Sequence, residues 1–295
     1  MKDIIIKELN NFEDLQVLVE LEHVIWGMAE ADNMSTGTIK AVISAGGLAL
    51  AAFDKEQAVA FAFGFPAYKN DGLGVGFHSH ILGVLPKYQS LGLGKKLKLK
   101  QREWCLSKNM NWMTWTFDPL QAGNAKFNIE YLGAVSNTYK INEYGLMGGE
   151  LNAELPSDRL LAFWDLSDDR VVGLLDGHRL EPASIKNLEP ALVSNLDKPV
   201  IIKNATAKAI SLEIPPNLNK LVKSNPKLAL KWRLALRELL IKYFAKGYRI
   251  ERFIDNSYIL LKYPNNPNIS RAWSKAYPKS FATDDSSFKH MEEEL

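Results

Sequence analysis

The sequence predicts an α/β protein, because strand-like and helix-like segments alternate along most of its 295 residues. Short apolar runs typical of buried strands are separated by longer segments in which apolar residues recur at helical spacing. One strand-like run leads through a glycine-rich loop directly into a basic helical segment. A second, smaller α/β unit is expected after residue 168. It contains a long amphipathic segment that starts at Asn225-Pro226.

Composition narrows the class of protein. Hydrophobic residues make up 46% of the chain, enough for a sizeable core. The net charge of +2 is mild, whereas a nucleic-acid-binding domain is usually strongly basic, so no nucleic-acid partner is expected. The single cysteine, Cys105, excludes an intramolecular disulfide. We see no signal-peptide pattern and no apolar run of spanning length, so we expect a cytoplasmic protein without a membrane partner.

The first unit, residues 1–168, is expected to begin with a strand, two helices and a hairpin. Asn11 is a suitable N-cap for the first helix, and Gly46-Gly47 would end the second. A polar turn and Pro66 bound the returning hairpin strand, and a glycine-rich loop at 69–76 follows. The expected strands are 3–9, 48–53 and 58–65; the expected helices are 12–26 and one from Thr36 or Thr38 to Ile43.

In the rest of the first unit, strands and helices are expected to alternate until two consecutive strands close it. A central strand at 77–85 leads into a helix at 94–108, then a strand at 112–117 that ends at Asp118-Pro119. A further helix at 124–132 ends at Gly133, and strands at 134–142 and 160–166 close the unit.

The second unit, residues 169–263, is expected to be a smaller α/β extension. It either packs on the first unit or extends its sheet, and it either caps an acceptor site or mediates homodimerisation. Strand-like segments at 198–209, 211–214, 248–253 and 257–263 surround a helix that starts at Pro226 and ends at Gly247. Residues 264–295 are polar and charged, as in a partly mobile tail.

The glycine-rich loop before the helix at 94–108 predicts an anion site. Free backbone N–H groups of a helix's first turn, together with the helix dipole, favour a phosphate. A Walker A loop does not fit, because Gln89 stands at its first glycine; a dinucleotide fingerprint does not fit, because Leu97 stands at its third. The remaining alternative to a phosphate site is an ordinary strand–helix turn.

The motif Gln-x-x-Gly-x-Gly at 89–94, preceded by Val84-Leu85-Pro86, resembles the acyl-CoA pyrophosphate loop of the GNAT superfamily of N-acetyltransferases. The resemblance covers residues 1–168 and implies a mixed, twisted sheet flanked by helices. It also implies acetyl-CoA, or another acyl-CoA, as co-substrate and no metal. The cofactor-binding residues that it implies are Leu82, Gly83, Val84, Gln89, Ser90, Leu91, Gly92, Leu93, Gly94, Lys95 and Asn124. The basic run from Lys95 to Arg102 could attract phosphates or form a solvated helix face.

Two histidines are the expected catalytic residues. His78 and His80 are two apart on a strand, so both face one side, and a histidine is the usual base for an amine proton. The arylalkylamine acetyltransferases of the same superfamily carry a similar His-x-His at this offset. By that resemblance His80 is the first choice as base and His78 the second. The alternative is that they are hydrogen-bonded core histidines.

The acid that protonates the leaving thiolate is not assigned by the sequence. Many GNAT proteins carry a tyrosine four residues before the glycine that ends the last helix, but here Ile129 holds that position. Tyr131 should face elsewhere, and Tyr139 and Tyr144 are other candidates. The substrate-binding residues that we expect are Asp118, at a strand end, and Arg159.

Four further segments resemble one bacterial GNAT subfamily with a C-terminal extension. They lie at 115–120, 124–128, 132–134 and 155–159, and Trp232-Arg233 matches a Trp-Arg helix in that extension. Some members are associated with N-succinylation of amino acids, which suggests an amino-acid-like acceptor. Arg159 could then bind its carboxylate, although a structural Asp158–Arg159 ion pair or turn is an equal alternative.

The function expected from the sequence is therefore an acyl-CoA-dependent N-acyltransferase that acts on a primary amine of a small molecule. Transfer of a succinyl group, or modification of a protein amine, remains open within the same fold. A catalytically silent CoA-binding module remains open as well, because the helix tyrosine is missing.

Overall fold

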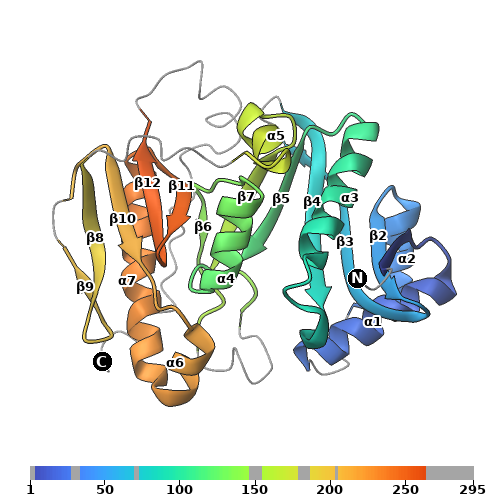
Figure 1. Cartoon of the computed structure of the whole chain (residues 1–295), viewed down its shortest axis with the longest axis horizontal. Coiled ribbons are helices and arrows are strands. Elements are labelled where there is room, and N and C mark those ends of the chain that lie inside the picture. Colours follow the sequence, from blue (N-terminus) through green and yellow to red (C-terminus); the bar gives the residue numbers. More distant parts are fainter. Residues whose placement is uncertain are drawn as a thin grey trace.

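The structure is a computed structural model, and it describes residues 4–27, 34–69, 73–145, 155–178, 187–202 and 205–263. The tail expected at 264–295 lies outside these residues. The described chain forms two sheets that stand side by side, with helices packed on both (Figure 1). Within the described residues no helix is long and apolar enough to cross a bilayer.

The first sheet has seven strands in the order β1-β2-β3-β4-β5-β7-β6. Its strands are β1 (Ile4–Glu8), β2 (Leu48–Asp54), β3 (Gln57–Lys69), β4 (Gly74–Val84), β5 (Trp112–Phe117), β6 (Tyr139–Lys140) and β7 (Arg159–Asp165). Only β4 and β5 pair in parallel, so the sheet is mixed as expected. The helix between them is the crossover connection that a parallel pair requires.

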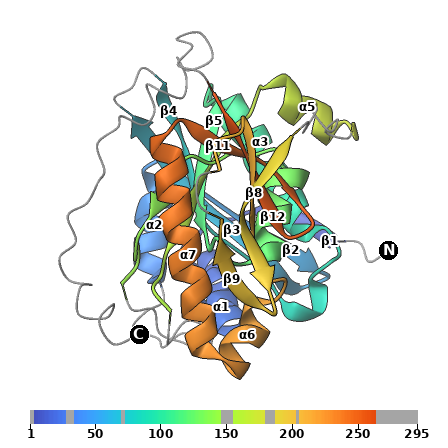
Figure 2. The ribbon, with the colours of Figure 1, turned by 90° about the vertical axis from the view of Figure 1, so that its left-hand side faces the viewer.

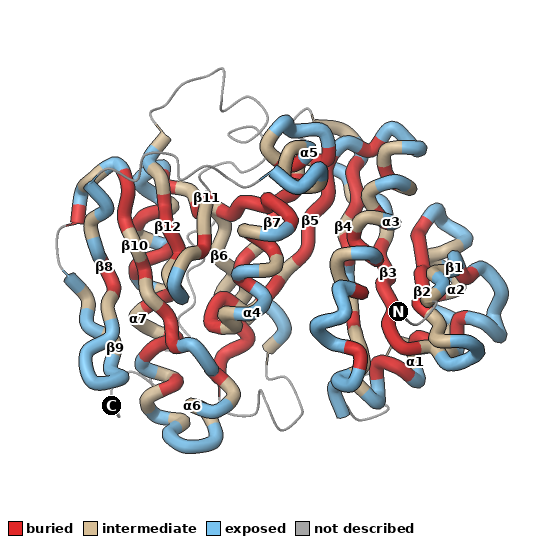
Figure 3. The backbone as a smooth tube through the Cα atoms, viewed as in Figure 1, coloured by how far each residue is buried: buried red, intermediate tan, exposed pale blue. Residues whose placement is uncertain are grey.

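Helices cover both faces of this sheet. They are α1 (Phe12–Trp26), α2 (Thr36–Ser44), α3 (Leu93–Ser107) and α4 (Ala122–Ala125), which continues as a π-helical segment, η3 (Lys126–Tyr131). Leu15, Leu18 and Ile39 of α1 and α2 pack with Phe61 on one face. Leu93, Leu97 and Cys105 of α3 pack with Ala60 and Phe77 on the other face. Buried positions therefore run along the central strands, as Figure 3 shows.

The β3–β4 hairpin is longer than predicted. Pro66 does not close the strand but lies inside β3, paired with Phe77 of β4. The pairing of β2 with β3 stops at Gly64, so the missing N–H of Pro66 breaks no bond on that side. The loop expected at 69–76 shrinks accordingly, because β4 already starts at Gly74.

The last strand pair is shorter than predicted. Of the strand expected at 134–142, only Tyr139–Lys140 forms β6, and Val135 adds an isolated bridge to Phe163. β7 matches its expected position closely.

The second sheet has five strands in the order β11-β12-β10-β8-β9. Its elements are β8 (Leu188–Asn195), β9 (Lys198–Ile201), β10 (Ala209–Glu213), α6 (Leu218–Ser224), α7 (Pro226–Ala245), β11 (Tyr248–Ile254) and β12 (Ser257–Lys262), with α5 (Asp169–Leu175) before them. Asn225 caps α7 through its side chain, as predicted. The sequence missed α5, β8 and α6. The strand expected at 198–209 is shorter, as β9, and the strand expected at 211–214 is β10. Figure 2 shows α7 running along this unit.

Three arginines of the second unit bind carboxylates of the first. Arg233 of α7 donates to both oxygens of Asp118, each at 2.7 Å. Arg237 binds Asp158 in the same bidentate way, at 2.8 and 2.9 Å. Arg252 of β11 binds Glu130. The unit thus packs on the first sheet rather than extending it; the backbone link between them is the isolated bridge of Ser136 with Ile250.

Candidate functional site

β4 and β5 begin to separate in the middle of the first sheet. They pair at two positions, Phe77 with Met113 and His78 with Thr114. The β3–β4 register shifts at Ser79 and His80, and from Ile81 to Val84 β4 pairs with β3 only. Figure 1 shows β4 and β5 diverging toward their C-terminal ends. A parallel pair that opens leaves backbone N–H and C=O groups on its inner edges, and these need other partners.

The predicted phosphate loop lies at the open end of this pair. Gly92 is the N-cap of α3 with φ +75°, a left-handed conformation that favours glycine, and no side chain caps the helix there. The Lys96 N–H donates to Gly92 O at 3.0 Å. The N–H groups of Leu93, Gly94 and Lys95 therefore belong to the first helical turn, where they have no helical acceptor. This arrangement can bind an anion.

The remaining loop residues hold the loop against β4. Ser90 also has a positive φ, +66°, and Gln89 donates its side-chain amide to Val84 O at 3.2 Å. Leu91 is 55% exposed. The structure thus brings the predicted residues 89–95 together with the end of β4.

The strand residues of the predicted cofactor set divide between the two faces. A Cβ built on Gly94 would lie 3.7 Å from Leu82, which places Leu82 on the α3 side. Gly83 is covered by Ile25 and Trp26 at the end of α1. Asn124 lies on α4 and is exposed.

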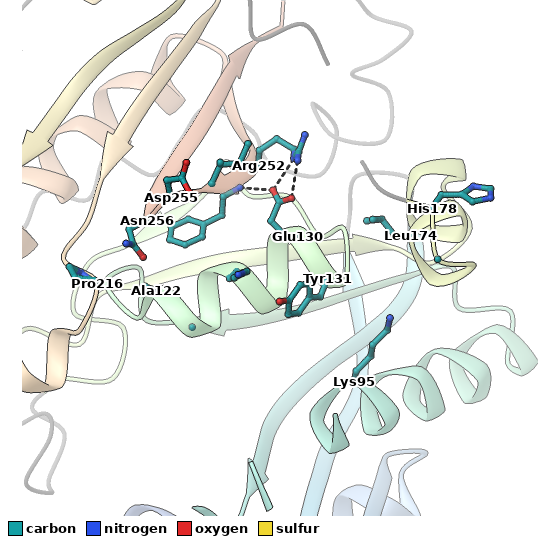
Figure 4. A pocket seen from close by; sticks show the side chains of 15 residues that line it. Lys95, Ala122, Glu130, Tyr131, Leu174, His178, Pro216, Arg252, Asp255 and Asn256 are labelled. Atoms are coloured by element: carbon teal, nitrogen blue, oxygen red, sulfur yellow. Dashed lines mark hydrogen bonds and ion pairs between the residues drawn. The ribbon is translucent and has the colours of Figure 1, made fainter. Parts of the chain in front are cut away.

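A cavity of about 830 Å³ begins beside the loop, at Lys95. Its lining comes from both units: Gly123, Lys126, Glu130 and Tyr131 from α4 and η3, Leu174 and His178 from α5 and the residues after it, and Arg252 to Asn256 from β11 and its turn. Figure 4 shows Lys95 facing the cavity from α3, with Tyr131 and the Glu130–Arg252 ion pair beyond it. The sequence did not predict the second unit's share of this wall, because no local pattern reports a contact between distant segments.

His78 and His80 lie together on the face opposite α3. Their rings are 6.2 Å apart and both contact the Phe65 ring, at 5.4 and 5.8 Å between centroids. The Nδ1 of His78 and the hydroxyl of Thr114 are 3.1 Å apart, within hydrogen-bond distance. His78 is partly buried, whereas His80 is exposed.

Both histidines favour the neutral form. Burial lowers the pKa of His78 to about 4, and the neighbouring His80 and Lys98 add to this. Burial also lowers the pKa of His80. A neutral imidazole can accept a proton, so either side chain can act as a base at neutral pH.

Polar side chains continue from the histidines across the same face of the sheet. Thr114 and Thr116 lie two residues apart on β5 and so share a face of the sheet. The Thr116 hydroxyl lies 2.8 Å from the Tyr144 hydroxyl. The guanidinium carbon of Arg159 stands 5.4 Å from the centre of the Tyr144 ring. We call the set His78, His80, Thr114, Thr116, Tyr144 and Arg159 the polar strip. The polar strip contains both predicted catalytic residues, His78 and His80, and the predicted substrate-binding residue Arg159.

Asp118, the other predicted substrate residue, is not available to a substrate. Both of its oxygens accept from Arg233, and its side chain is only 12% exposed. Burial raises the pKa of Asp118, but the Arg233 guanidinium outweighs this and holds the pKa below its ordinary value. Asp158 binds Arg237 and the hydroxyl of Tyr139, and the Arg159 guanidinium donates to the backbone oxygen of Asp158 at 2.9 Å.

Two of the tyrosines considered as acids are placed elsewhere. Tyr131 is 51% exposed at the cavity. Tyr139 donates to Asp158 at 2.6 Å, and burial raises its pKa well above the usual value. Ile129, at the position expected for the acid, is fully buried in the core.

Lys98 is a residue at this site whose position the sequence did not predict. It belongs to the basic run, yet it is 3% exposed and points into the sheet rather than to solvent. Its Nζ donates to Ser79 Oγ at 2.8 Å. The signal was the spacing, since Lys98 follows Gly94 by four residues and so shares its helix face.

The described residues include no group of three or more His, Cys, Asp or Glu side chains suited to a metal ion.

The fold resembles solved N-acetyltransferases over about half of the chain. The ribosomal-protein-S18-alanine N-acetyltransferase from Escherichia coli is 18% identical, with a TM-score of 0.45 over 56% of this chain and 95% of that one. An N-acetyltransferase from Staphylococcus aureus is 15% identical, with a TM-score of 0.44 over 56% and 99%. The aminoglycoside 6'-acetyltransferase type Ii is 18% identical, with a TM-score of 0.43 over 56% and 98%.

No family model and no curated protein sequence matches this chain. The first sheet with its helices nevertheless has the form that the motif at 89–94 implied, a mixed sheet flanked by helices.

Proposed function

We propose that this protein is an acyl-CoA-dependent N-acyltransferase that acts on a primary amine of a small molecule. The observation that carries the proposal is the separation of β4 from β5. The N-terminus of α3, which no side chain caps, lies at the open end, and two neutral histidines lie beside the separation. This one site offers anion binding, a channel for an extended chain and a base.

The acyl-CoA would bind along β4. Its pyrophosphate would accept from the N–H groups of residues 93–95, where the α3 dipole favours negative charge. The pantetheine arm would run between β4 and β5 and replace the strand partner that residues 79–84 lack on that side. The nucleotide end would enter the 830 Å³ cavity, where Lys95 and Lys126 supply positive charge.

The amine would attack the thioester carbonyl from the side of the polar strip. His80, directly or through a water molecule, takes the amine proton, because it is the more exposed of the two histidines. His78 would hold the geometry through Thr114. Proximity of the two bound substrates supplies much of the acceleration.

The polar strip also suggests the acceptor class. Arg159 lies at the far end of the strip from the histidines, and a guanidinium binds a carboxylate through two parallel hydrogen bonds. A small molecule with an amine at one end and a carboxylate at the other, as in an amino acid, fits this arrangement. Acetyl-CoA is the first donor to test and succinyl-CoA the second.

The deciding experiment is thermal unfolding of the full chain with acetyl-CoA, succinyl-CoA, free CoA, NAD or ATP. A ligand that binds the folded state raises its stability by mass action. We expect a concentration-dependent rise in Tm with the CoA compounds alone. Mass analysis of amino acids incubated with the best donor then identifies the product. No shift with any CoA compound, in protein shown to be folded, refutes the proposal.

A further inference from the structure

A buried lysine lies where β4 and β5 begin to separate. The Lys98 Nζ donates to Ser79 Oγ at 2.8 Å and lies 3.7 Å from the centre of the Trp115 ring. Ser79 and Trp115 are the first residues beyond the paired positions of β4 and β5. The Lys98 amine therefore spans both strands at the point of separation, on the α3 side of the sheet.

This lysine has no counter-ion among the described residues. The described ion pairs leave it out, and the charged or titratable group that acts on it from its own helix is the Cys105 thiol. The Ser79 hydroxyl donates a hydrogen bond to Gln101 Oε1 at 2.8 Å, and Gln101 Nε2 is buried without a partner. An ammonium has three donors, and Ser79 and the ring face engage two. A buried amine without a counter-ion holds its proton weakly, and such a group beside a proposed binding site is a candidate functional residue.

The position of Lys98 matches the end of the proposed acyl-CoA channel. In the proposed binding mode the pantetheine arm would start at the first turn of α3, beside the end of β4, and run back along β4 toward Ser79. Five strand steps from Val84 to Ser79 cover about 17 Å, comparable with an extended pantetheine arm. The thioester at the end of the arm would then lie at the point of separation, with Lys98 on one side of the sheet and His80 on the other.

We propose that Lys98 is the proton donor to the departing CoA thiolate, an inference that rests on the function proposed above. The amine nitrogen forms the new C–N bond with the carbonyl carbon, and the C–S bond breaks. The sulfur electron pair takes a proton from Lys98 Nζ, so CoA leaves as a thiol. His80 takes the proton that the amine loses. Water then removes the proton from His80 and returns one to Lys98.

The electrostatics around Lys98 suit this role. Burial lowers the pKa of Lys98 well below its ordinary value, and the Cys105 thiol opposes this effect. A lower pKa makes the ammonium a stronger acid. From β4, His78 faces Lys98 across the sheet and remains neutral; from β5, the facing side chain is the Trp115 ring, which does not titrate in this range.

The test compares the pH dependence of kcat in full-length variants. Lys98→Met keeps most of the apolar stem but removes the donor. We expect kcat to fall about 100-fold, the KM for acyl-CoA to change little, and the alkaline limb of the profile to disappear. The matched control is Lys108→Met, an exposed lysine just past the other end of α3, which should behave as wild type.

Ser79→Ala is the second variant, and it decides the matter alone if Lys98→Met fails to fold. Loss of the Ser79 acceptor destabilises the charged amine, so the alkaline limb should move to lower pH. An unchanged limb in this variant overturns the proposal, as does a folded Lys98→Met variant with wild-type kcat. Loss of the limb in Tyr144→Phe instead would assign the acid to that tyrosine. If wild-type protein neither binds nor consumes acyl-CoA, the proposed function fails, and the Lys98 proposal with it.

Discussion

His78 and His80 share one face of β4 but differ in what surrounds them. His78 is held by Thr114 and is partly buried, and its pKa of about 4 makes it a weak base. His80 is exposed on the same face, where an incoming amine can reach it. A base is most effective when its pKa lies near the working pH, so the more exposed histidine is the better candidate.

The first prediction concerns these two histidines as catalysts. His80→Gln should lower kcat about 100-fold with little change in the KM for acyl-CoA, because it removes the base and leaves the channel intact. His78→Gln should cost less, since a pKa of about 4 leaves it little proton affinity to lose. Steady-state kinetics with the acceptor from the amine screen measures both. Wild-type kcat in both variants would contradict the base assignment.

The second prediction concerns His78 and stability. Between pH 6.5 and about 4 the unfolded chain binds a proton at His78 that the folded chain does not. Acid therefore favours unfolding, and this part of the stability is present above pH 6.5 and lost as the pH falls toward 4. The free energy of unfolding from urea titrations at pH 7 and pH 5 should differ less in His78→Gln than in wild type. A variant at the exposed His23 is the control; an equal pH dependence in His78→Gln and wild type would contradict the prediction.

The third prediction concerns the acceptor end of the polar strip. Arg159→Gln should raise the KM for an amino-acid acceptor about tenfold, because the bidentate contact with the carboxylate is lost. The KM for acyl-CoA should not change. The comparison uses the acceptor and its decarboxylated amine in parallel. If Arg159→Gln weakens both acceptors equally, the carboxylate is not what Arg159 binds.

At the level of elements, α3 combines two roles. Its first turn offers bare N–H groups to an anion, and its second turn sends Lys98 into the sheet. The backbone conformation and the space at position 94 do not require a glycine. A Cβ there would make ordinary contacts, with Phe127 at 3.6 Å and Leu82 at 3.7 Å. The value of Gly94 is that it leaves the helix end open, whereas Gly92 is required by its positive φ.

The fourth prediction follows from this difference. Gly94→Glu should abolish measurable CoA binding without reducing the Tm, because a carboxylate in the first turn repels phosphate but suits the helix dipole. Gly94→Ala is the matched control and should bind CoA within a few-fold of wild type. Titration calorimetry with CoA measures both. Equal affinity in a folded Gly94→Glu variant would remove the loop from the binding site.

At the level of the whole molecule, the second unit completes the first. Arg233 and Arg237 of α7 neutralise Asp118 and Asp158, and the β11–β12 turn forms one wall of the cavity. Arg233 is 1% exposed, so this pair is desolvated, and each partner would be costly alone. The ion pairs therefore tie the end of β5 to the second unit.

The fifth prediction tests that link. Arg233→Met should lower the free energy of unfolding by about 3–5 kcal/mol, because Asp118 is left buried without its partner. Adding Asp118→Asn should recover much of this loss, since the unpaired charge is gone. Lys100→Met, which breaks the exposed pair with Glu103, should cost under about 1 kcal/mol. Urea unfolding measures these variants and Asp118→Asn alone. If the double variant loses as much stability as Arg233→Met and Asp118→Asn together, the two residues are not coupled.

The sequence by itself determined the order and type of nearly all elements in the first unit and the loop before α3. Local signals carry these features: apolar periodicity, and glycines in a loop that leads from a strand into a helix. The same signals failed where neighbours decide. Pro66 is tolerated inside β3 because the pairing with β2 stops at Gly64. β8 pairs with β10, and α6 packs against α7.

Only the tertiary structure decided which partners the polar side chains at the site have. Asp118 looks available in the sequence, yet Arg233, 115 residues away, occupies both of its oxygens. In the sequence Lys98 looks like one of several surface lysines, but in the structure it is buried against the sheet. Spacing along the chain sets which face a residue takes, but its burial, partners and pKa depend on distant segments that only folding brings together.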